Sequence, residues 1–190
     1  MEAQTLEGGF ATPAVDAAHA FRAIMGAMAR PGLINSIQGA APPAPVSVAA
    51  GTVLLTLCDP DTPVHLAGAH DCEAVRTWIA FHTGAPFASA DRAMFAVGTW
   101  GALGDLNAYP IGTSEYPDRS STLIVEMDAI ASDGATLRGP GIKETATLSL
   151  PEIDAFQFNQ ALFPLGLDFI FTSGTDIAAL PRTTEVQPCM

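Results

Sequence analysis

A carboxylate, a guanidinium and two hydroxyls near the C-terminus are the groups in this sequence best placed to act together. Asp168 precedes one apolar segment, and Arg182 follows a second one, with Thr183 and Thr184 directly after it. A guanidinium can pair with a carboxylate or a phosphate through two parallel hydrogen bonds. The four residues therefore form either a structural ion pair or a small polar binding site, and the ion pair is favoured because such networks are common.

The elements that must position these groups form a predicted β-hairpin. Phe169–Phe171 and Ile177–Leu180 are short apolar runs separated by a turn signal at Ser173-Gly174, a pattern typical of two buried strands. Pro181 ends the second strand, because proline cannot donate a hydrogen bond to a sheet. The start of the first strand and the end of the second lie side by side in a hairpin, so Asp168 and the residues after Pro181 are expected to meet.

Helices and strands are predicted to alternate through the rest of the chain. Such interleaving is typical of an α/β layered fold, and a length of 190 residues without a linker-like segment predicts one domain over 1–190. Helices are expected at 16–30, 46–57, 71–83 and 151–162. Strands are expected at 33–37, 64–66, 94–97 and 121–127, with two more within 135–150 that include 141–144, while 98–119 is expected to be mostly loop.

Several helix details follow from side-chain spacing and capping preferences. Asp16 and Asp71 are predicted to cap the first and third helices, since aspartate is favoured at a helix N-terminus. Pro151 is predicted to open the last helix. The first helix is expected to bury one face at three- and four-residue spacing, made of Phe21, Ile24, Met25 and Met28.

Composition and charge exclude some classes of partner. The chain has 20 acidic and 8 basic residues, a formal net charge of -12, and no basic cluster. Phosphate backbones and anionic membranes would be repelled at long range, so neither nucleic acid nor membrane binding is expected. A hydrophobic share of 48% with 15% charged residues predicts a globular chain with apolar surface available to a protein partner. The N-terminus does not resemble a secretion signal, which predicts a cytoplasmic location.

A metal site and a hydrolase triad have weaker support in the sequence. Six possible metal ligands lie within fifteen residues, but they lack paired zinc-ligand spacing, so scattered structural use is favoured; they are Cys58, Asp59, Asp61, His65, His70 and Cys72. A hydrolase triad of Ser114, His82 and Asp168 has no supporting motif. His82, at the end of a predicted helix, can titrate near neutrality and face a cleft or a subunit boundary, although a buried histidine satisfied by a backbone carbonyl is the favoured interpretation.

Several blocks of this sequence resemble the PhnH family, the H subunit of the bacterial carbon-phosphorus lyase system. The blocks occur in the family's order and cover nearly the whole chain. They are the segments 27–32 (AMARPG), 53–57 (VLLTL) running into Asp59, Asp61, Thr62, Pro63 and Val64, 81–83 (FHT) with Ala85-Pro86, 163–172 (FPLGLDFIFT) and 179–184 (ALPRTT).

The resemblance implies a three-layer α/β/α sandwich with a mixed sheet, similar to the core of pyridoxal-phosphate-dependent transferases but without the cofactor. A Schiff base with that cofactor requires a lysine. Lys143 is the sole lysine of the chain, and the family pattern does not demand a lysine in that strand-like segment. No cofactor is therefore expected. No metal is expected either, because the possible ligands lack paired spacing.

The resemblance also implies a role in phosphonate catabolism. In this family the G, H, I and L subunits together convert a phosphonate and ATP into ribose 1-phosphonate 5-triphosphate and adenine, and the I subunit is regarded as the catalytic one. The H subunit is expected to form a homodimer and to dock to the G, I and J subunits.

Three hypotheses about molecular role remain open. The favoured one is a structural interaction subunit, not catalytic alone. The alternative is that Asp168, Arg182, Thr183, Thr184 and His82 contact substrate or a partner at a shared active site, because an arginine suits phosphate recognition. The weaker alternative is a free-standing small-molecule enzyme, which the acidity of the chain disfavours for an anionic substrate.

Overall fold

The computed structural model describes residues 7–189, and a mixed six-stranded sheet organises them. The strand order is β1-β8-β7-β4-β3-β2. The four strands β2, β3, β4 and β7 are parallel, whereas β8 and β1 run antiparallel to their neighbours. The strands are β1 (Asn35–Ser36), β2 (Val64–Leu66), β3 (Phe95–Thr99), β4 (Thr122–Glu126), β7 (Asp168–Ser173) and β8 (Asp176–Leu180).

Five α-helices and a small second sheet complete the described part of the chain. The small sheet is antiparallel and has the order β6-β5-β9, with β5 (Ala135–Arg138), β6 (Ala146–Leu148) and β9 (Glu185–Gln187). The helices are α2 (Pro13–Ala29), α3 (Val48–Leu57), α4 (Glu73–Thr83), α5 (Trp100–Leu103) and α6 (Ile153–Ala161). Three short 3-10 turns are η1 (Gly68–His70), η2 (Ala90–Arg92) and η3 (Leu106–Ala108). None of the helices in residues 7–189 is long and apolar enough to cross a bilayer.

The central strands are apolar on both faces, which is why they must lie between two layers. Successive side chains of a strand point to opposite faces. In β4, Leu123 and Val125 belong to one core and Ile124 to the other, and the paired residues of β7 divide in the same way. Strands buried on both faces read as continuous apolar runs, as the sequence of β4 and β7 does.

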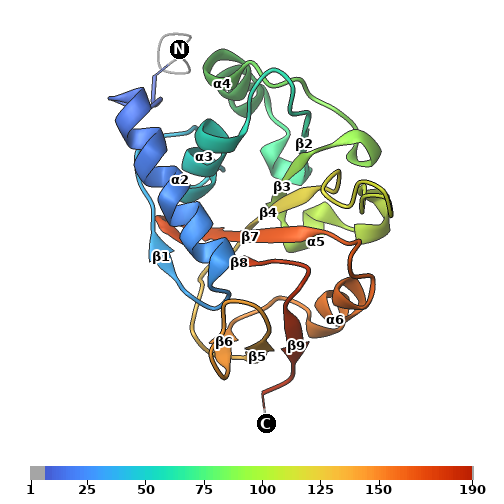
Figure 1. Cartoon of the computed structure of the whole chain (residues 1–190). Helices are drawn as coiled ribbons and strands as arrows, with labels where there is room; N and C mark the ends of the chain where they lie inside the picture. The colour runs from blue at the N-terminus through green and yellow to red at the C-terminus, as the bar shows by residue number, and fades with distance from the viewer. Residues whose placement is uncertain (1–6, 190) are drawn as a thin grey trace.

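The helices α2, α3 and α4 cover one face of the main sheet. Their core residues include Ile24, Leu54 and Trp78, which pack in one cluster with Ile124 and Ile170 of the sheet. The helix α3 is buried almost all round and carries few polar groups, as expected of a helix inside a protein. Figure 1 shows α2 and α3 in front of the sheet and α4 at its upper edge.

The opposite face is covered by a mixture of elements from the second half of the chain. Leu103 of α5, Phe156 of α6, and residues of all three strands of the small sheet share a core with Phe169 and Phe171 of β7. The aromatic rings of Phe156 and Phe169 meet edge to face with centroids 4.9 Å apart, a favoured geometry. In Figure 1 the small sheet lies below the main sheet and α6 lies at its lower right.

The terminal hairpin is confirmed. The strands β7 and β8 pair antiparallel with Phe169 opposite Leu180, so the chain returns past the start of β7. Gly174 has a φ of +57° in the connecting turn, a conformation that glycine adopts without strain. The predicted helices at 46–57 and 71–83 are also confirmed within a few residues as α3 and α4.

The predicted buried face of the first helix was partly wrong. Ile24 is buried, but Phe21 and Met25 are exposed and Met28 is half-buried. The face that contacts the sheet is instead formed by Ala20, Ile24 and Ala27. Small side chains let the helix approach the sheet closely, so the larger side chains at neighbouring positions are left outside.

The predicted helix caps were also wrong. Thr12 is the N-cap of α2, because Pro13 fits the first turn, and Asp16 accepts a hydrogen bond from the Thr12 N–H at 2.7 Å. Cys72 precedes α4, and Asp71 instead pairs with Arg76 one turn into the helix.

The structure also differs from the predicted helix start at Pro151 and from two predicted strands. Glu152 precedes α6, so Pro151 lies outside that helix. The strand expected at 33–37 shrinks to Asn35–Ser36, and the strand-like segment 141–144 contains no strand.

Gly141 fixes how the small sheet meets the end of α2. It has a φ of +83°, and a Cβ atom there would lie 1.9 Å from the carbonyl oxygen of Ala29. Gly174 also has a positive φ, but a Cβ atom would meet nothing within 4 Å. We expect Gly174→Ala to lower the free energy of unfolding by about 1 kcal/mol through backbone strain, and Gly141→Ala by about 3 kcal/mol or more because backbone must also move. Urea unfolding of both variants checks this, and equal losses would contradict the packing described here.

Candidate functional site

Asp168 and Arg182 meet at the end of the hairpin. The Arg182 backbone N–H donates to Asp168 Oδ1 at 2.9 Å, Nε donates to the same oxygen at 3.2 Å, and Nη2 donates to Oδ2. Both side chains are largely buried, with 12% and 18% of the Arg182 and Asp168 side chains exposed. The pairing follows from the register of the hairpin, in which the start of β7 lies beside the residues after β8.

The rest of the Arg182 guanidinium holds a segment far away in the sequence. Nη1 donates to the carbonyl oxygen of Pro117 at 2.7 Å, and Nη2 also donates to Ser120 Oγ. With the bonds to Asp168, four of the five guanidinium N–H groups have protein acceptors. The ion pair therefore ties the hairpin to the segment 117–120.

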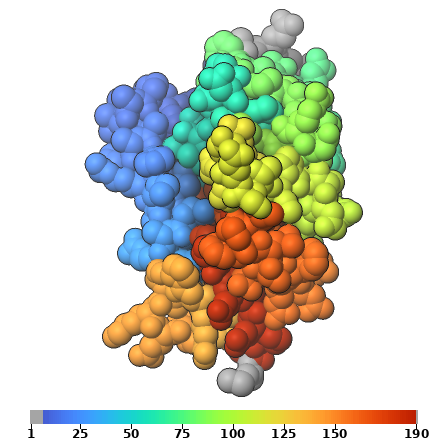
Figure 2. All heavy atoms as spheres, turned by 45° about the vertical axis from the view of Figure 1, so that its right-hand side comes forward, coloured from blue at the N-terminus to red at the C-terminus, as the bar shows by residue number. Residues whose placement is uncertain are grey.

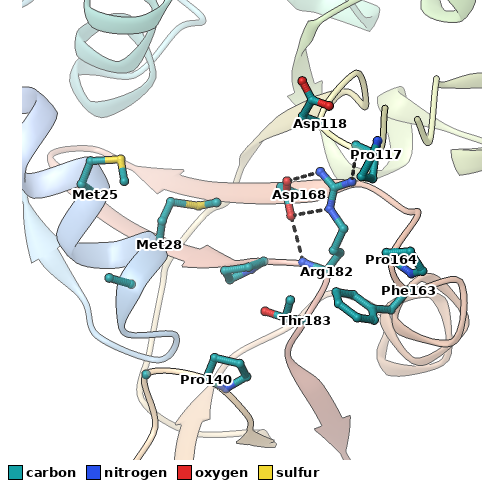
Figure 3. Close-up of a pocket in the computed structure, with 13 residues that line it drawn as sticks. Met25, Met28, Pro117, Asp118, Pro140, Phe163, Pro164, Asp168, Arg182 and Thr183 are labelled. Carbon is teal, nitrogen blue, oxygen red and sulfur yellow. Dashed lines mark hydrogen bonds and ion pairs between the residues drawn. The ribbon is translucent and has the colours of Figure 1, made fainter. Parts of the chain in front are cut away.

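A groove of about 590 Å³ opens beside this ion pair. Its walls come from α2, the segment before β4, the β5–β6 connection, the α6–β7 connection and the residues after β8. Figure 3 shows Met25 and Met28 on one side, Phe163 and Pro164 on the other, and Arg182 between them. Most of the lining is carbon, so the groove offers an apolar surface whose charged residues are the ion pair and Asp118.

The structure separates the other candidate residues. Thr183 lines the groove, whereas Thr184 is buried and its Oγ1 has no hydrogen-bond partner among the described residues. His82 does not line the groove; it lies on α4, with Nε2 3.3 Å from the Glu7 carbonyl oxygen and its ring centroid 5.0 Å from that of Trp78. The predicted carbonyl partner of His82 is thus present, but the predicted burial is wrong, because His82 is only half-buried.

The residues of the other chemistries are likewise dispersed or engaged. Asp59 accepts from the Asp61 N–H in a turn, and His65 Nδ1 lies 3.1 Å from the Ala88 carbonyl oxygen. Within residues 7–189, no three histidine, cysteine or acidic side chains are grouped so that they could hold a metal ion. Lys143 is exposed in a bend. Burial raises the pKa of Cys58 to about 12, so this thiol stays protonated.

A second polar cluster lies at the opposite end of the sheet. Glu126, the last residue of β4, accepts from the Ser47 N–H at 2.7 Å and from Thr172 Oγ1 at 3.1 Å. His70 Nε2 lies 4.0 Å from Glu126 Oε1, and neither ring nitrogen of His70 has a hydrogen-bond partner in the described part of the chain. Burial lowers the pKa of His70 below 6.5, although the nearby Glu126 opposes that change.

Some members of both clusters were missed by sequence reasoning. Ser120 and Pro117 are 62 and 65 residues away from Arg182. The segment 98–119 has no helical or strand periodicity that would have placed them. Met25, predicted to lie in the core, instead lines the groove. The alanines of α2 could have indicated the groove. Because Ala20 and Ala27 lie with Ile24 on the buried face, Phe21 and Met25 are left exposed.

We expect removal of Arg182 to destabilise the protein strongly. Arg182→Ala leaves a largely buried carboxylate unpaired and should lower the free energy of unfolding by about 3 kcal/mol. The matched control is Arg76→Ala, because Arg76 also pairs with an aspartate, Asp71, but the two side chains are 44% and 40% exposed. An exposed pair contributes about 0.5 kcal/mol. Urea unfolding measures both, and a similar small loss for the two variants would contradict a structural role for Arg182.

His70 predicts a pH dependence of stability. Its pKa is lower in the folded protein than in the unfolded chain, so the unfolded chain binds the proton more readily. Stability should therefore fall as the pH drops through the unfolded value of 6.5. His70→Leu should make stability between pH 8 and about pH 5.5 less dependent on pH. An unchanged slope in His70→Leu would contradict this account.

Comparison with known proteins identifies the family. Residues 8–187 match the family model described as bacterial phosphonate metabolism protein (PhnH). The alpha-D-ribose 1-methylphosphonate 5-triphosphate synthase subunit PhnH of Rhizobium meliloti (strain 1021) is 42% identical over 195 residues, covering 98% of each chain. The putative C-P lyase subunit protein HtxG of Stutzerimonas stutzeri is 31% identical over 175 residues, covering 88% of this chain and 84% of HtxG. The chain belongs to the PhnH family of bacterial phosphonate metabolism proteins.

Proposed function

We propose that this chain is a subunit of a carbon-phosphorus lyase system and serves in it as an interaction subunit. Its membership of the PhnH family and its 42% identity to a named synthase subunit support this role. In the proposal it acts in the cytoplasm with G, I and L subunits, which together convert a phosphonate and ATP into ribose 1-phosphonate 5-triphosphate and adenine. The chain itself brings no cofactor and does not catalyse the reaction alone.

The observation that carries the structural role is the engagement of Arg182. A phosphate-binding arginine must offer its N–H groups to the ligand. Here the fork is occupied by Asp168, Ser120 and the Pro117 carbonyl oxygen, so a triphosphate would have to displace a carboxylate that is already ideally placed. The net charge of -12 adds long-range repulsion against such a ligand.

The position of the groove in the sheet supports the same conclusion. Asp168 is the first residue of β7, so the groove lies at the amino end of a parallel strand. Ligands of open α/β sheets bind beyond the carboxyl ends of the strands. In this chain the carboxyl ends of β4 and β7 instead hold Glu126 and Thr172, which are hydrogen-bonded to each other.

An apolar docking face extends from the groove along α2. Phe21 and Met25 of α2 and Phe163 are exposed, and Met25 and Phe163 line the groove. Exposed apolar surface of this kind marks protein interfaces. We propose that this face, defined by Phe21, Met25 and Phe163, supports both a homodimer of the isolated chain and docking to the G, I and J subunits.

We propose that residues 1–190 form one PhnH-like domain whose core is a three-layer α/β/α sandwich similar to that of pyridoxal-phosphate-dependent transferases, without the cofactor. The coverage of one sheet face by α2, α3 and α4, and of the other by α5, α6 and the small sheet, is compatible with that architecture.

A shared active site is the second candidate function. Arg182, Asp168 and Thr183 all line the groove, and one N–H of Arg182 Nη1 has no acceptor within residues 7–189. A partner subunit could therefore present an anionic substrate to this end of the hairpin. His82 and Thr184 do not line the groove, so they would not take part.

Reconstitution of the assembly tests the proposal. We expect Phe21→Glu/Met25→Glu to prevent co-purification with the partner subunits, because two charges would be buried at the interface. Phe81→Glu, at an exposed phenylalanine of α4, is the matched control and should co-purify normally.

A second experiment measures adenine release from ATP and methylphosphonate by an Arg182→Lys complex that has been shown to be folded and assembled. Its rate should lie within about twofold of that of the unchanged protein, which corresponds to less than ~0.5 kcal/mol in the activation barrier.

One result would overturn the proposed docking face, and another would overturn the interaction role. Normal assembly of Phe21→Glu/Met25→Glu would show that the docking face lies elsewhere. Loss of adenine release by an assembled Arg182→Lys complex, with substrate affinity or turnover reduced by tenfold or more, would favour the shared active site.

A further inference from the structure

A second, smaller pocket lies away from the groove, between α5, η3 and α6. Its volume is about 250 Å³, below the range of ordinary small-molecule sites, so it suits a single side chain. Trp100 and Phe158 supply aromatic walls, and Asp105 and Glu152 supply carboxylates. Figure 2 shows the yellow-green segment of α5 and η3 beside the orange segment of α6 on one face of the molecule.

The aromatic walls are positioned in advance. Trp100 packs against the buried Phe156, with ring centroids 4.9 Å apart, and its Nε1 donates to Glu152 Oε2 at 3.1 Å. These two contacts hold the indole in one orientation. Phe158 of α6 is 58% exposed although it is a large apolar side chain, and it lines the pocket together with Glu152, the residue that precedes α6.

The charges of the pocket are all negative. Its ionisable lining residues are Asp105 and Glu152, with neither lysine nor arginine among the lining residues. Asp154 adds a further carboxylate in the first turn of α6. Acidic residues at the amino end of a helix offset its partial positive charge, so the local field does not favour an anion.

Aromatic faces beside carboxylates recognise cations. A guanidinium or ammonium group lies favourably over a tryptophan or phenylalanine ring and pairs with a carboxylate. We propose that this pocket binds an arginine or lysine side chain of a partner protein, at a surface separate from the apolar docking face. The formal charge of -12 on this chain draws a basic segment of a partner toward it.

The inference rests on the proposed function in one respect only, namely that the cation belongs to a partner subunit. The pocket itself can be tested without any partner. The chain has two tryptophans, Trp78 and Trp100. Trp78 is fully buried and donates to the Glu7 carbonyl oxygen, so its indole signal serves as an internal control.

The first experiment follows the two indole N–H signals by NMR during titration with N-acetyl-arginine methylamide. We expect a saturable shift of the Trp100 signal with little change at Trp78, and no comparable shift with the neutral citrulline analogue. Glu152→Gln retains an acceptor for Trp100 and removes only the charge, so it should weaken binding about tenfold. Asp154→Asn, which removes a neighbouring charge that does not line the pocket, should change affinity less than threefold.

The second experiment measures assembly with the partner subunits. Glu152→Lys should weaken co-purification at least tenfold, while Asp133→Lys, at an exposed acidic residue of the β4–β5 connection, should not. Equal shifts with the arginine and citrulline probes, or no shift, would overturn the pocket as a cation site. Arginine binding with normal assembly of Glu152→Lys would overturn the partner assignment. Failure of the unchanged protein to assemble at all would instead contradict the proposed function.

Discussion

The ion pair between Asp168 and Arg182 is the interaction on which the site depends. It joins the first residue of β7 to the residues that leave β8, and through Arg182 it also holds Pro117 and Ser120. Because β7 lies between β4 and β8 in the centre of the sheet, the segment before β4 is fixed against the hairpin at the same point. The groove wall formed by Pro117 and Asp118 is positioned by this tie.

The amino end of β7 is the part of the main sheet that is left to contact a partner. Helices cover one face, and α5, α6 and the small sheet cover the other, so both faces are occupied. The carboxyl edge is also occupied, because Glu126 accepts hydrogen bonds from Ser47 and Thr172. The amino edge of β7 is left with a mostly apolar groove beside α2. This arrangement suits contact with another protein better than capture of a free anion.

The hairpin and its ion pair were predictable from the sequence because the contacts are local. Strand, turn and strand occur within thirteen residues, and antiparallel register brings Asp168 and Arg182 together. The partners in segment 117–120 were not predictable, since they come from a region without periodicity more than sixty residues away. The exposed face of α2 was misjudged because spacing shows which residues share a face but not which face turns inward. There the alanines decide the outcome, since Ala20 and Ala27 allow close packing that Phe21 and Met25 would prevent.

The most direct test of the structural tie is amide hydrogen exchange in residues 111–121 of Arg182→Lys. Lysine keeps the positive charge but lacks the planar fork that reaches Asp168, Ser120 and Pro117 together. If Arg182 fixes this segment, its amides should exchange at least about tenfold faster, corresponding to ~1.4 kcal/mol of local stability. The amides of α4, which does not contact the tie, should be unchanged. Unchanged exchange in 111–121 would contradict the claim that this ion pair holds the groove in place.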